Sequence, residues 1–494
     1  QLKLWLAEFL ANQRNLQLAE STIKEFIDRE PGLFELRFAL GKIHEALGNF
    51  AEASRVYDEI IALDVDGADS LKARNRKIGI AMRDFHVEEA EPIIEEVLAI
   101  EPENSTALVT KARILVGRAD YEDAVALLRT VTKNEPNNVL AWVRLGEANA
   151  LRGATDLAVD NYKSALALRP GLIEALQPLY ALLSSRGEDK AAWQYLTSAA
   201  AIEPDSVAIK ELVFNAALAA QDHDTARGVG EWFSGQGEVS AYLFAMISLS
   251  EGKVEEARAQ LIELVTSGHA DWPVIRDLIG TYLLPEDQEG ALSLLNTLRQ
   301  KFPTNPFLPV GQARLLATRG DLDQAARLYD ESFELQANLL ALDGAIRIAL
   351  QREGPDEALS LIRSVEPGFA KSPRFLLTEA QVFEAVGAVS EAVSTYERIL
   401  MLAPSSKVAA NNLAMLLLTL PTASQQSSLS PQSLTERFAN STDASFLDTR
   451  GRALLAAENY PGAIAAFEKA ISVGGGEVVD NNLLVIAEEA MRDR

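Results

Sequence analysis

The chain has 494 residues, and its 46 Lys and Arg against 71 Asp and Glu give a net charge of −25 at pH 7. A charge of that sign argues against general nucleic-acid binding and against adhesion to anionic membranes. The sequence contains no cysteine, which excludes a disulfide framework, a thiol nucleophile and a thiolate metal site. No apolar run approaches the roughly 18 residues that would span a bilayer, so we expect no integral membrane segment.

A recurring unit is clearest in the middle of the N-terminal half, where the sequence predicts two helices and a turn. The first helix covers about Leu140–Leu151, with apolar residues at the three-and-four spacing of one helical face. The second covers about Thr155–Leu168 and is closed by Pro170, which lacks the amide that a continuing helix would need. The small residues Gly146 and Ala158 suit a close crossing of the two helices.

The alanine near the start of the second helix recurs along nearly the whole chain. It stands at Ala19, Ala53, Ala90, Ala124, Ala158, Ala192, Ala226, Ala257, Ala291, Ala325, Ala358, Ala392 and Ala463. The intervals are 31 to 37 residues, except for a last interval of 71 residues, which spans one degenerate repeat. The period predicts about 14 repeats in one array, in which each helix pair buries its apolar faces against its neighbours.

The residue types of the unit resemble the tetratricopeptide repeat (TPR). The positions that carry the resemblance are Trp142, Leu145, Gly146, Ala158, Tyr162, Ala165 and Pro170. The resemblance implies an all-α solenoid of about 14 helix-turn-helix repeats that forms a right-handed superhelix with the first helices on its concave side. It also implies a non-catalytic scaffold that binds a peptide or a partner protein along that concave groove.

Irregular segments predict how the array is divided. Residues 227–237, RGVGEWFSGQG, place glycines where a second helix is expected, so we predict a frayed helix there and a bend between two halves. The predicted parts are an N-terminal array, 1–237, and a C-terminal array, 238–476. The C-terminal array contains a Ser/Gln-rich loop at 421–433 in the degenerate repeat. Residues 477–494 are predicted to form a helix that caps the last apolar face.

The sequence offers little for catalysis or metal binding. Its four histidines, His44, His86, His223 and His269, are separated by more than one repeat each, and no H-E-x-x-H spacing occurs. There is also no phosphate-binding loop and no nucleophile-elbow motif. We therefore expect no catalytic residue, no metal and no cofactor.

Basic residues recur at positions of the first helices that are predicted to line the groove. They are Lys42, Arg76, Arg83, Arg113, Arg144, Arg314, Arg347 and Arg452. Charge of one sign on a concave surface steers partners of the opposite sign, so we predict an acidic protein or peptide ligand, with its acidic groups favouring the N-terminal half. The alternative is that neighbouring acids such as Glu45 and Glu147 absorb these charges in salt bridges along the groove.

A narrower resemblance lies near the C-terminal end. Asn411–Ala414 and Leu447–Gly451 are similar to the terminal repeats of long bacterial TPR proteins, some of which belong to cell-envelope polysaccharide or protein-export systems. The implied role is that of an assembly factor in such a machine. The chain begins at Gln1, so we expect that a leader or anchor has been removed, and the compartment, bacterial periplasm or cytoplasm, stays open.

Two other functions remain open at this point. The first is a substrate-binding arm of an enzyme whose catalytic domain is absent from this chain. The second is a self-assembling scaffold, in which the end of one solenoid docks in the groove of another. A longer gene would favour the first, and concentration-dependent light scattering would favour the second.

Overall fold

The computed structural model describes residues 16–30, 32–83, 86–235, 237–282, 287–352, 354–364, 369–420, 427, 429–474 and 481–492. Regular structure in these residues is helical throughout, and no strand occurs among them. The helices alternate between first and second members of pairs, as the period predicts. The all-α repeat solenoid predicted from the sequence is confirmed.

The first helices are α3 (Phe34–Ala46), α5 (Ala68–Arg83), α7 (Ser105–Gly117), α9 (Val139–Leu151), α11 (Ile173–Ser185), α13 (Val207–Ala219), α15 (Gly237–Ser250), α17 (Trp272–Gly280), α19 (Phe307–Thr318), α21 (Leu339–Arg352), α23 (Pro373–Ala385), α25 (Lys407–Thr419) and α27 (Ala444–Ala456). The second helices are α2 (Leu16–Arg29), α4 (Phe50–Leu63), α6 (Val87–Ile100), α8 (Tyr121–Asn134), α10 (Thr155–Leu168), α12 (Asp189–Ile202), α14 (His223–Trp232), α16 (Val254–Thr266), α18 (Gln288–Lys301), α20 (Leu322–Leu335), α22 (Pro355–Arg363), α24 (Val389–Leu402) and α28 (Tyr460–Gly474). We number the repeats from the one that contains α2, so repeat four is α7–α8 and repeat five is α9–α10.

Small residues allow the helices of a pair to cross closely, as predicted. The recurring alanines of the second helices are at most 2% exposed. A Cβ atom added to Gly146 would lie 2.7 Å from the ring of Tyr162, and one added to Gly41 would lie 2.6 Å from the ring of Tyr57. The aromatic ring of the second helix therefore occupies the space that a side chain at the glycine would need.

The predicted fraying at residues 227–237 is wrong for the part that precedes Trp232. Helix α14 runs unbroken through Gly228 and Gly230, although at ten residues it is shorter than the fourteen of α12. The hydroxyl of Ser240 donates to the carbonyl of Gly230 (2.8 Å), and a Cβ at Gly230 would lie 3.3 Å from Phe244. Packing of the next helix onto the glycine thus outweighs the low helix propensity of glycine.

Hydrophobic packing continues past residue 237. In α15, Phe244 and Ile247 pack with the core of the preceding repeats, and Ala245 belongs to the core of the following ones. The division into 1–237 and 238–476 stays a prediction.

The C-terminal end departs from the prediction in one respect. Residues 421–426 and 428 of the predicted loop lie outside the described residues. Pro431–Thr435 forms the short helix α26, followed by the 3-10 turn η4 (Glu436–Phe438), so the predicted loop boundary at 433 is wrong. Within the predicted capping segment, α29 (Asn481–Arg492) packs on α28 and buries Ala487.

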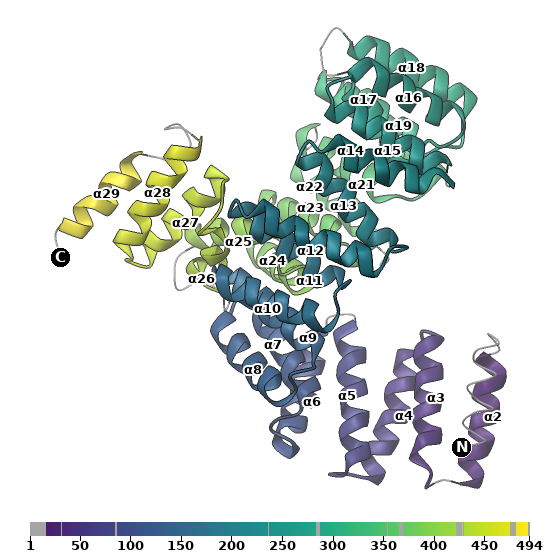
Figure 1. Cartoon of the computed structure of the whole chain (residues 1–494), viewed down its shortest axis with the longest axis vertical. Helices are drawn as coiled ribbons and strands as arrows, with labels where there is room; N and C mark the ends of the chain where they lie inside the picture. The colour runs from purple at the N-terminus through teal and green to yellow at the C-terminus, as the bar shows by residue number, and fades with distance from the viewer. Residues whose placement is uncertain are drawn as a thin grey trace.

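The array turns back on itself instead of extending in a line. Figure 1 shows α6–α10 leading to α15–α19 at the far end, and α22–α25 returning. The returning helices bring repeats twelve and thirteen against repeats four and five, where residues of both stretches share one hydrophobic core. This long-range contact places the two ends of the loop next to each other.

Candidate partner-binding surface

Charge separates between the two layers of helices. Within the bounds given above, the first helices carry 19 Lys and Arg against 12 Asp and Glu, whereas the second helices carry 15 against 31. The contrast is greatest near the N-terminus. There α5 and α7 together hold seven basic residues and one acid, and α6 between them holds five acids and no basic residue. An acidic chain thus has a net basic first-helix layer.

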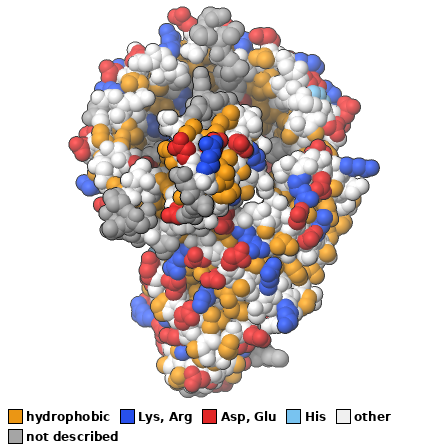
Figure 2. All heavy atoms as spheres, turned by 90° about the vertical axis from the view of Figure 1, so that its left-hand side faces the viewer, with side chains coloured by type: hydrophobic (Ala, Val, Ile, Leu, Met, Phe, Trp, Pro, Cys, Tyr) orange, Lys and Arg blue, Asp and Glu red, His pale blue; other side chains and the backbone are white. Residues whose placement is uncertain are grey.

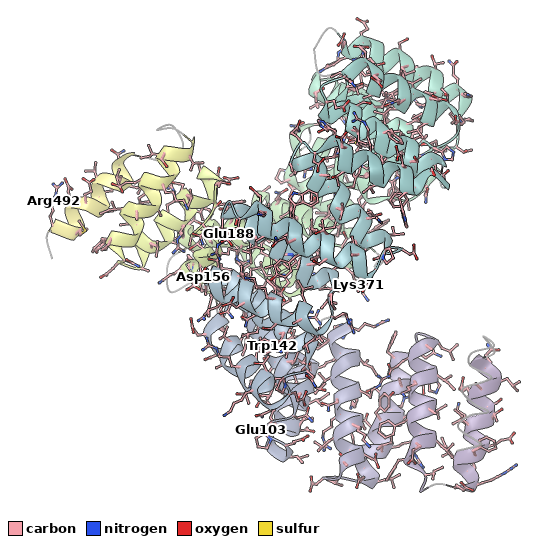
Figure 3. The ribbon with its side chains drawn as sticks, viewed as in Figure 1. Glu103, Trp142, Asp156, Glu188, Lys371 and Arg492 are labelled. Atoms are coloured by element: carbon pink, nitrogen blue, oxygen red, sulfur yellow. The ribbon has the colours of Figure 1, made fainter. Side chains whose placement is uncertain are left out.

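Ion pairs between acidic and basic side chains reduce this charge separation on the molecular surface. Acidic and basic side chains are interspersed over the face shown in Figure 2. Asp156 and Glu188, both labelled in Figure 3, lie on neighbouring repeats and bind the same residue, Arg186, at 2.7 and 2.8 Å. Exposed pairs of this kind contribute little stability each.

Arg76 belongs to a local network on the first helices of repeats two and three. Its Nη2 lies 2.9 Å from Glu45 Oε2, and its Nε lies 3.2 Å from Glu45 Oε1. The Tyr57 hydroxyl donates to the same carboxylate at 2.6 Å. Burial and the adjoining Glu45 raise the pKa of Tyr57, so this phenol stays a donor. The surroundings of Arg76 therefore match the predicted alternative, in which neighbouring acids neutralise basic residues along the groove.

Arg113 and Arg144 form the first cluster in which arginines outnumber acids. Arg144 Nη1 lies 2.7 Å from Glu147 Oε2 on the same helix. Arg113 is half-buried beside them, and burial together with the like charge of Arg144 lowers the pKa of its guanidinium. We call Arg113, Arg144 and Glu147 the N-terminal arginine cluster.

A second cluster forms on α21 and α23, and we call it the C-terminal arginine cluster. Arg347 Nε lies 3.3 Å from Asp343 Oδ1, and Arg374 Nη2 lies 3.2 Å from Asp343 Oδ2. The Thr378 hydroxyl also donates to Asp343. Burial alone would raise the pKa of Asp343, but Thr378 and the two arginines hold it below its ordinary value. Two guanidinium groups therefore share one ionised carboxylate.

Sequence reasoning missed Arg374, although a signal existed. Positions two, five, nine and twelve of a repeat, counting Trp142 as position four, were expected to face the groove. Arg374 occupies position two of its repeat, whereas the predicted arginines come mainly from position nine. Arg314 lies near this cluster, since both Arg314 and Arg347 act on the phenol of Tyr329. Its guanidinium stacks over Trp272, 4.7 Å from the ring centroid.

The remaining predicted residues have local surroundings. Lys42 is exposed on α3. Arg83 stacks over Phe50, 3.3 Å from the ring centroid. Arg452 Nε lies 2.6 Å from Asp448 Oδ2, one helical turn earlier on α27. The structure thus groups Arg113 with Arg144 and Arg314 with Arg347.

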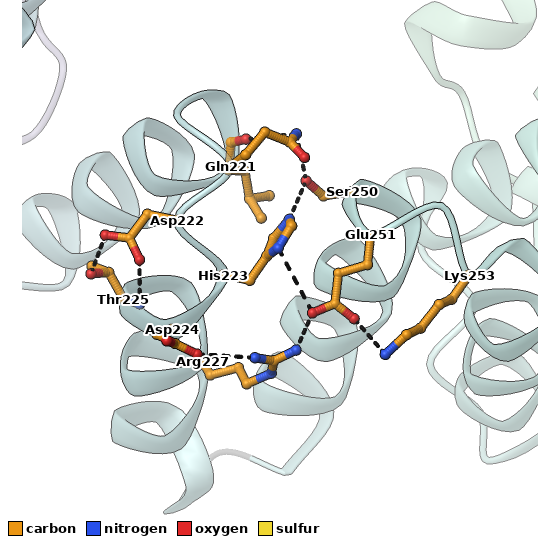
Figure 4. A network of polar contacts seen from close by, with 10 residues as sticks. Gln221, Asp222, His223, Asp224, Thr225, Arg227, Ser250, Glu251 and Lys253 are labelled. Atoms are coloured by element: carbon orange, nitrogen blue, oxygen red, sulfur yellow. Dashed lines mark hydrogen bonds and ion pairs between the residues drawn. The ribbon is translucent and has the colours of Figure 1, made fainter.

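The histidine with the richest polar surroundings is His223 (Figure 4). Its Nε2 lies 3.1 Å from Ser250 Oγ, and its Nδ1 lies 3.8 Å from Glu251 Oε1. This order resembles a nucleophilic triad, but 3.8 Å is too long for the orienting hydrogen bond. Glu251 instead binds Arg227 and Lys253. The network therefore ties the start of α14 to the turn between α15 and α16.

Metal binding and membrane insertion are the two further possibilities in the described part of the chain. Nowhere in it do three or more His, Asp or Glu residues gather in a way that would hold a metal ion. Each helix in it is also too short or too polar to span a membrane.

Repeated helix pairs, close glycine crossings and an alternating charge define a helical-repeat solenoid. Residues 6–70 and 109–173 match the tetratricopeptide repeat family. Both stretches are similar to tetratricopeptide repeats, which supports the resemblance predicted from the sequence.

Comparison with known proteins finds similarity over a short stretch or at low sequence identity. Mouse anaphase-promoting complex subunit 7 is 33% identical over 90 residues, which is 18% of this chain and 16% of that protein. Among solved structures, Naa15/Naa10 bound to HypK-THB has 13% identity and a TM-score of 0.38, covering 99% of this chain and 96% of that one. Yeast Tom70 has 13% identity and a TM-score of 0.37, covering 80% and 96%.

Proposed function

We propose that this chain is a non-catalytic protein-binding scaffold whose first-helix face holds an extended acidic segment of a peptide or partner protein. The main support for this proposal is the charge separation between the two helix layers. The first helices carry 19 basic and 12 acidic residues, and the second helices carry 15 basic and 31 acidic residues. A surface of one sign raises the encounter rate with partners of the opposite sign. The acidic second helices repel the same partners, which favours one face.

The two arginine clusters supply the contact chemistry. A guanidinium has five N–H donors in a fixed fork that matches a carboxylate. At the C-terminal cluster, Asp343 takes one N–H each from Arg347 and Arg374, whose side chains are 61% and 47% exposed. The exposed forks are suited to two carboxylates of an incoming segment.

The resemblance of the C-terminal repeats to bacterial cell-envelope proteins supports a setting for this scaffold, namely the assembly of an envelope export machine. The proposal about the binding face does not depend on that setting.

A charge-reversal experiment tests the binding face. We would replace Arg76, Arg113 and Arg144 by Glu and compare affinity capture from the native lysate with the wild type. The control reverses Arg55, Arg129 and Arg327, which are exposed on second helices and change the net charge by the same amount. Circular dichroism checks that helical content is unchanged. We expect a discrete partner to be lost only with the first-helix variant. Retention in both variants, or equal loss in both, would contradict the proposal.

A further inference from the structure

One hydrophobic core joins two stretches of the chain that are more than 200 residues apart. It contains residues of α7–α9, such as Val116 and Leu151, together with residues of α23–α25, such as Leu376 and Ile399. Helix α24 packs against α7, and η4 packs against α9. Figure 1 shows α24–α26 beside the column of α7–α10.

The degenerate repeat supplies the centre of this contact. Where other repeats have a second helix, repeat thirteen has α26 and η4. Leu429, Leu434 and Phe438 from this segment are at most 4% exposed, and all belong to the shared core. Phe438 also stacks on Phe446, with ring centroids 4.9 Å apart. The irregularity in the sequence therefore coincides with the segment that reaches across to repeats four and five.

Arg437 connects the two stretches with polar contacts. Its Nη2 donates to the hydroxyl of Tyr121 (2.5 Å), 316 residues away, and its Nη1 donates to the carbonyl of Pro404. On its other side, the segment is held by Arg450, which donates to the carbonyl of Thr435 (2.9 Å). Tyr121 is only 2% exposed, so these contacts lie within the interface.

The facing edge of repeats four and five is shaped to receive this segment and the end of α24. A Cβ at Gly117 would overlap Met401 Sδ and lie 3.3 Å from the Met401 Cα. A Cβ at Gly153 would lie 3.4 Å from the carbonyl oxygen of Glu436. The edge therefore has no side chain at these two points of contact.

Gly117 is not the residue that takes a positive φ in the turn of its repeat. The turn within a pair commonly has a glycine with positive φ, as at Gly48 and Gly153, but in repeat four Ala119 takes this conformation at φ 56°. A non-glycine residue adopts it at a conformational cost. Gly117, two residues before Ala119 at the end of α7, does not have a positive φ. What matters at Gly117 is the absence of a side chain against Met401.

We propose that residues 429–439, together with Met401 at the end of α24, form an intramolecular clasp. The clasp docks on the turn edge of repeats four and five, around Gly117, Tyr121 and Gly153, and holds the array in a closed turn. When the clasp is released, repeats twelve to fourteen separate from repeats four and five while each keeps its helices. This inference concerns conformation alone and does not depend on the acidic partner proposed above.

Distance measurement between spin labels tests the clasp. The chain contains no cysteine, so Lys133→Cys on α8 and Glu468→Cys on α28, both exposed positions, give one specific label pair. We expect one narrow distance distribution in the otherwise wild-type chain. Gly117→Leu is expected to lengthen and broaden it. Gly79→Leu is the matched control, because a Cβ at Gly79 meets nothing within 4 Å.

The outcomes separate the clasp from its alternatives. An unchanged distance in Gly117→Leu would overturn the inference. If that variant loses helical content, Arg437→Gln with Tyr121→Phe removes the polar contacts without adding volume, and it must also lengthen the distance. Light scattering that finds the wild type as a dimer, with the labels close only between copies, would overturn the intramolecular docking.

Discussion

The first repeats and the middle repeats of this molecule use the same helix pair but are held in different ways. Residues around Tyr57, Ile60 and Ala73 form a small core that joins only α4 and its neighbours. Repeats four and five share their core with repeats twelve and thirteen. In the first arrangement each repeat is stabilised by contacts with its nearest neighbours, which is usual for repeat arrays. The second couples distant repeats, so a change in one is expected to affect the other.

The largest expected effect is that of emptying the shared core. Phe438→Ala removes a fully buried ring, for which we expect a loss of about 3–5 kcal/mol of unfolding free energy. Hydrogen exchange should rise in residues 105–151 as well as in residues 376–438, with α2–α5 unchanged. Phe467→Ala, at an equally buried ring in the local core of α27 and α28, is the control. A Phe438→Ala effect confined to the C-terminal repeats would contradict the coupling.

An N-terminal variant gives the reverse test. Gly41→Ala forces a methyl group to within 2.6 Å of the Tyr57 ring, and we expect overpacking to cost about 1–3 kcal/mol. Because the core around Tyr57 joins α4 to its neighbours α3 and α5, faster exchange should be limited to α3–α5. Faster exchange in α24 or α25 would show that the whole chain unfolds as one unit and would remove the distinction.

A smaller effect compares polar contacts in the two regions. The double-mutant cycle of Tyr121→Phe and Arg437→Ala should give a coupling of about 1.5 kcal/mol or more, as a buried hydrogen bond to a charged group does. The cycle of Glu45→Gln and Arg76→Ala should give less than about 1 kcal/mol, because that pair is more exposed. Urea unfolding of all six variants and the wild type measures both couplings. Equal couplings would contradict the greater burial of the clasp.

The smallest effect is on the pH dependence of stability. Burial raises the pKa of Glu436 in the clasp, so the folded state loses stability as the pH rises past the unfolded value of about 4.3. The pKa of Asp343 is lowered, so its contribution is complete above about pH 3.9 and is lost as the pH falls through its folded pKa. At pH 7, Glu436→Gln should stabilise the protein and Asp343→Asn should destabilise it. Both differences should shrink on acidification, and equal signs at pH 7 would contradict this assignment.

Local features of this fold were predictable because they recur. The period placed the buried alanines, and Gly146 identified a crossing that the ring of Tyr162 fills. The glycines of α14 misled the prediction, because propensity says nothing about the contacts that Gly230 makes with Ser240 and Phe244. Arg374 was overlooked, although it occupies a position of the first helix that was expected to face the groove.

The long-range contact was beyond the reach of the periodic pattern. Gly117 and Met401 contact each other across repeats that are far apart in the sequence. Neither residue is part of the recurring hydrophobic pattern, so the pattern did not predict this contact. The degenerate repeat was visible in the sequence, but its partner was not, because residues such as Leu434 and Phe438 are apolar whatever surface they cover. Which arginines gather around Asp343 likewise depends on how neighbouring first helices are stacked.

Small-angle X-ray scattering of the wild-type chain at low concentration is the most direct test of the closed turn. We expect a scattering curve that matches the structure with α24–α26 docked on α7–α9. A larger radius of gyration, and a curve that fits only an extended array with repeats four and thirteen apart, would contradict it.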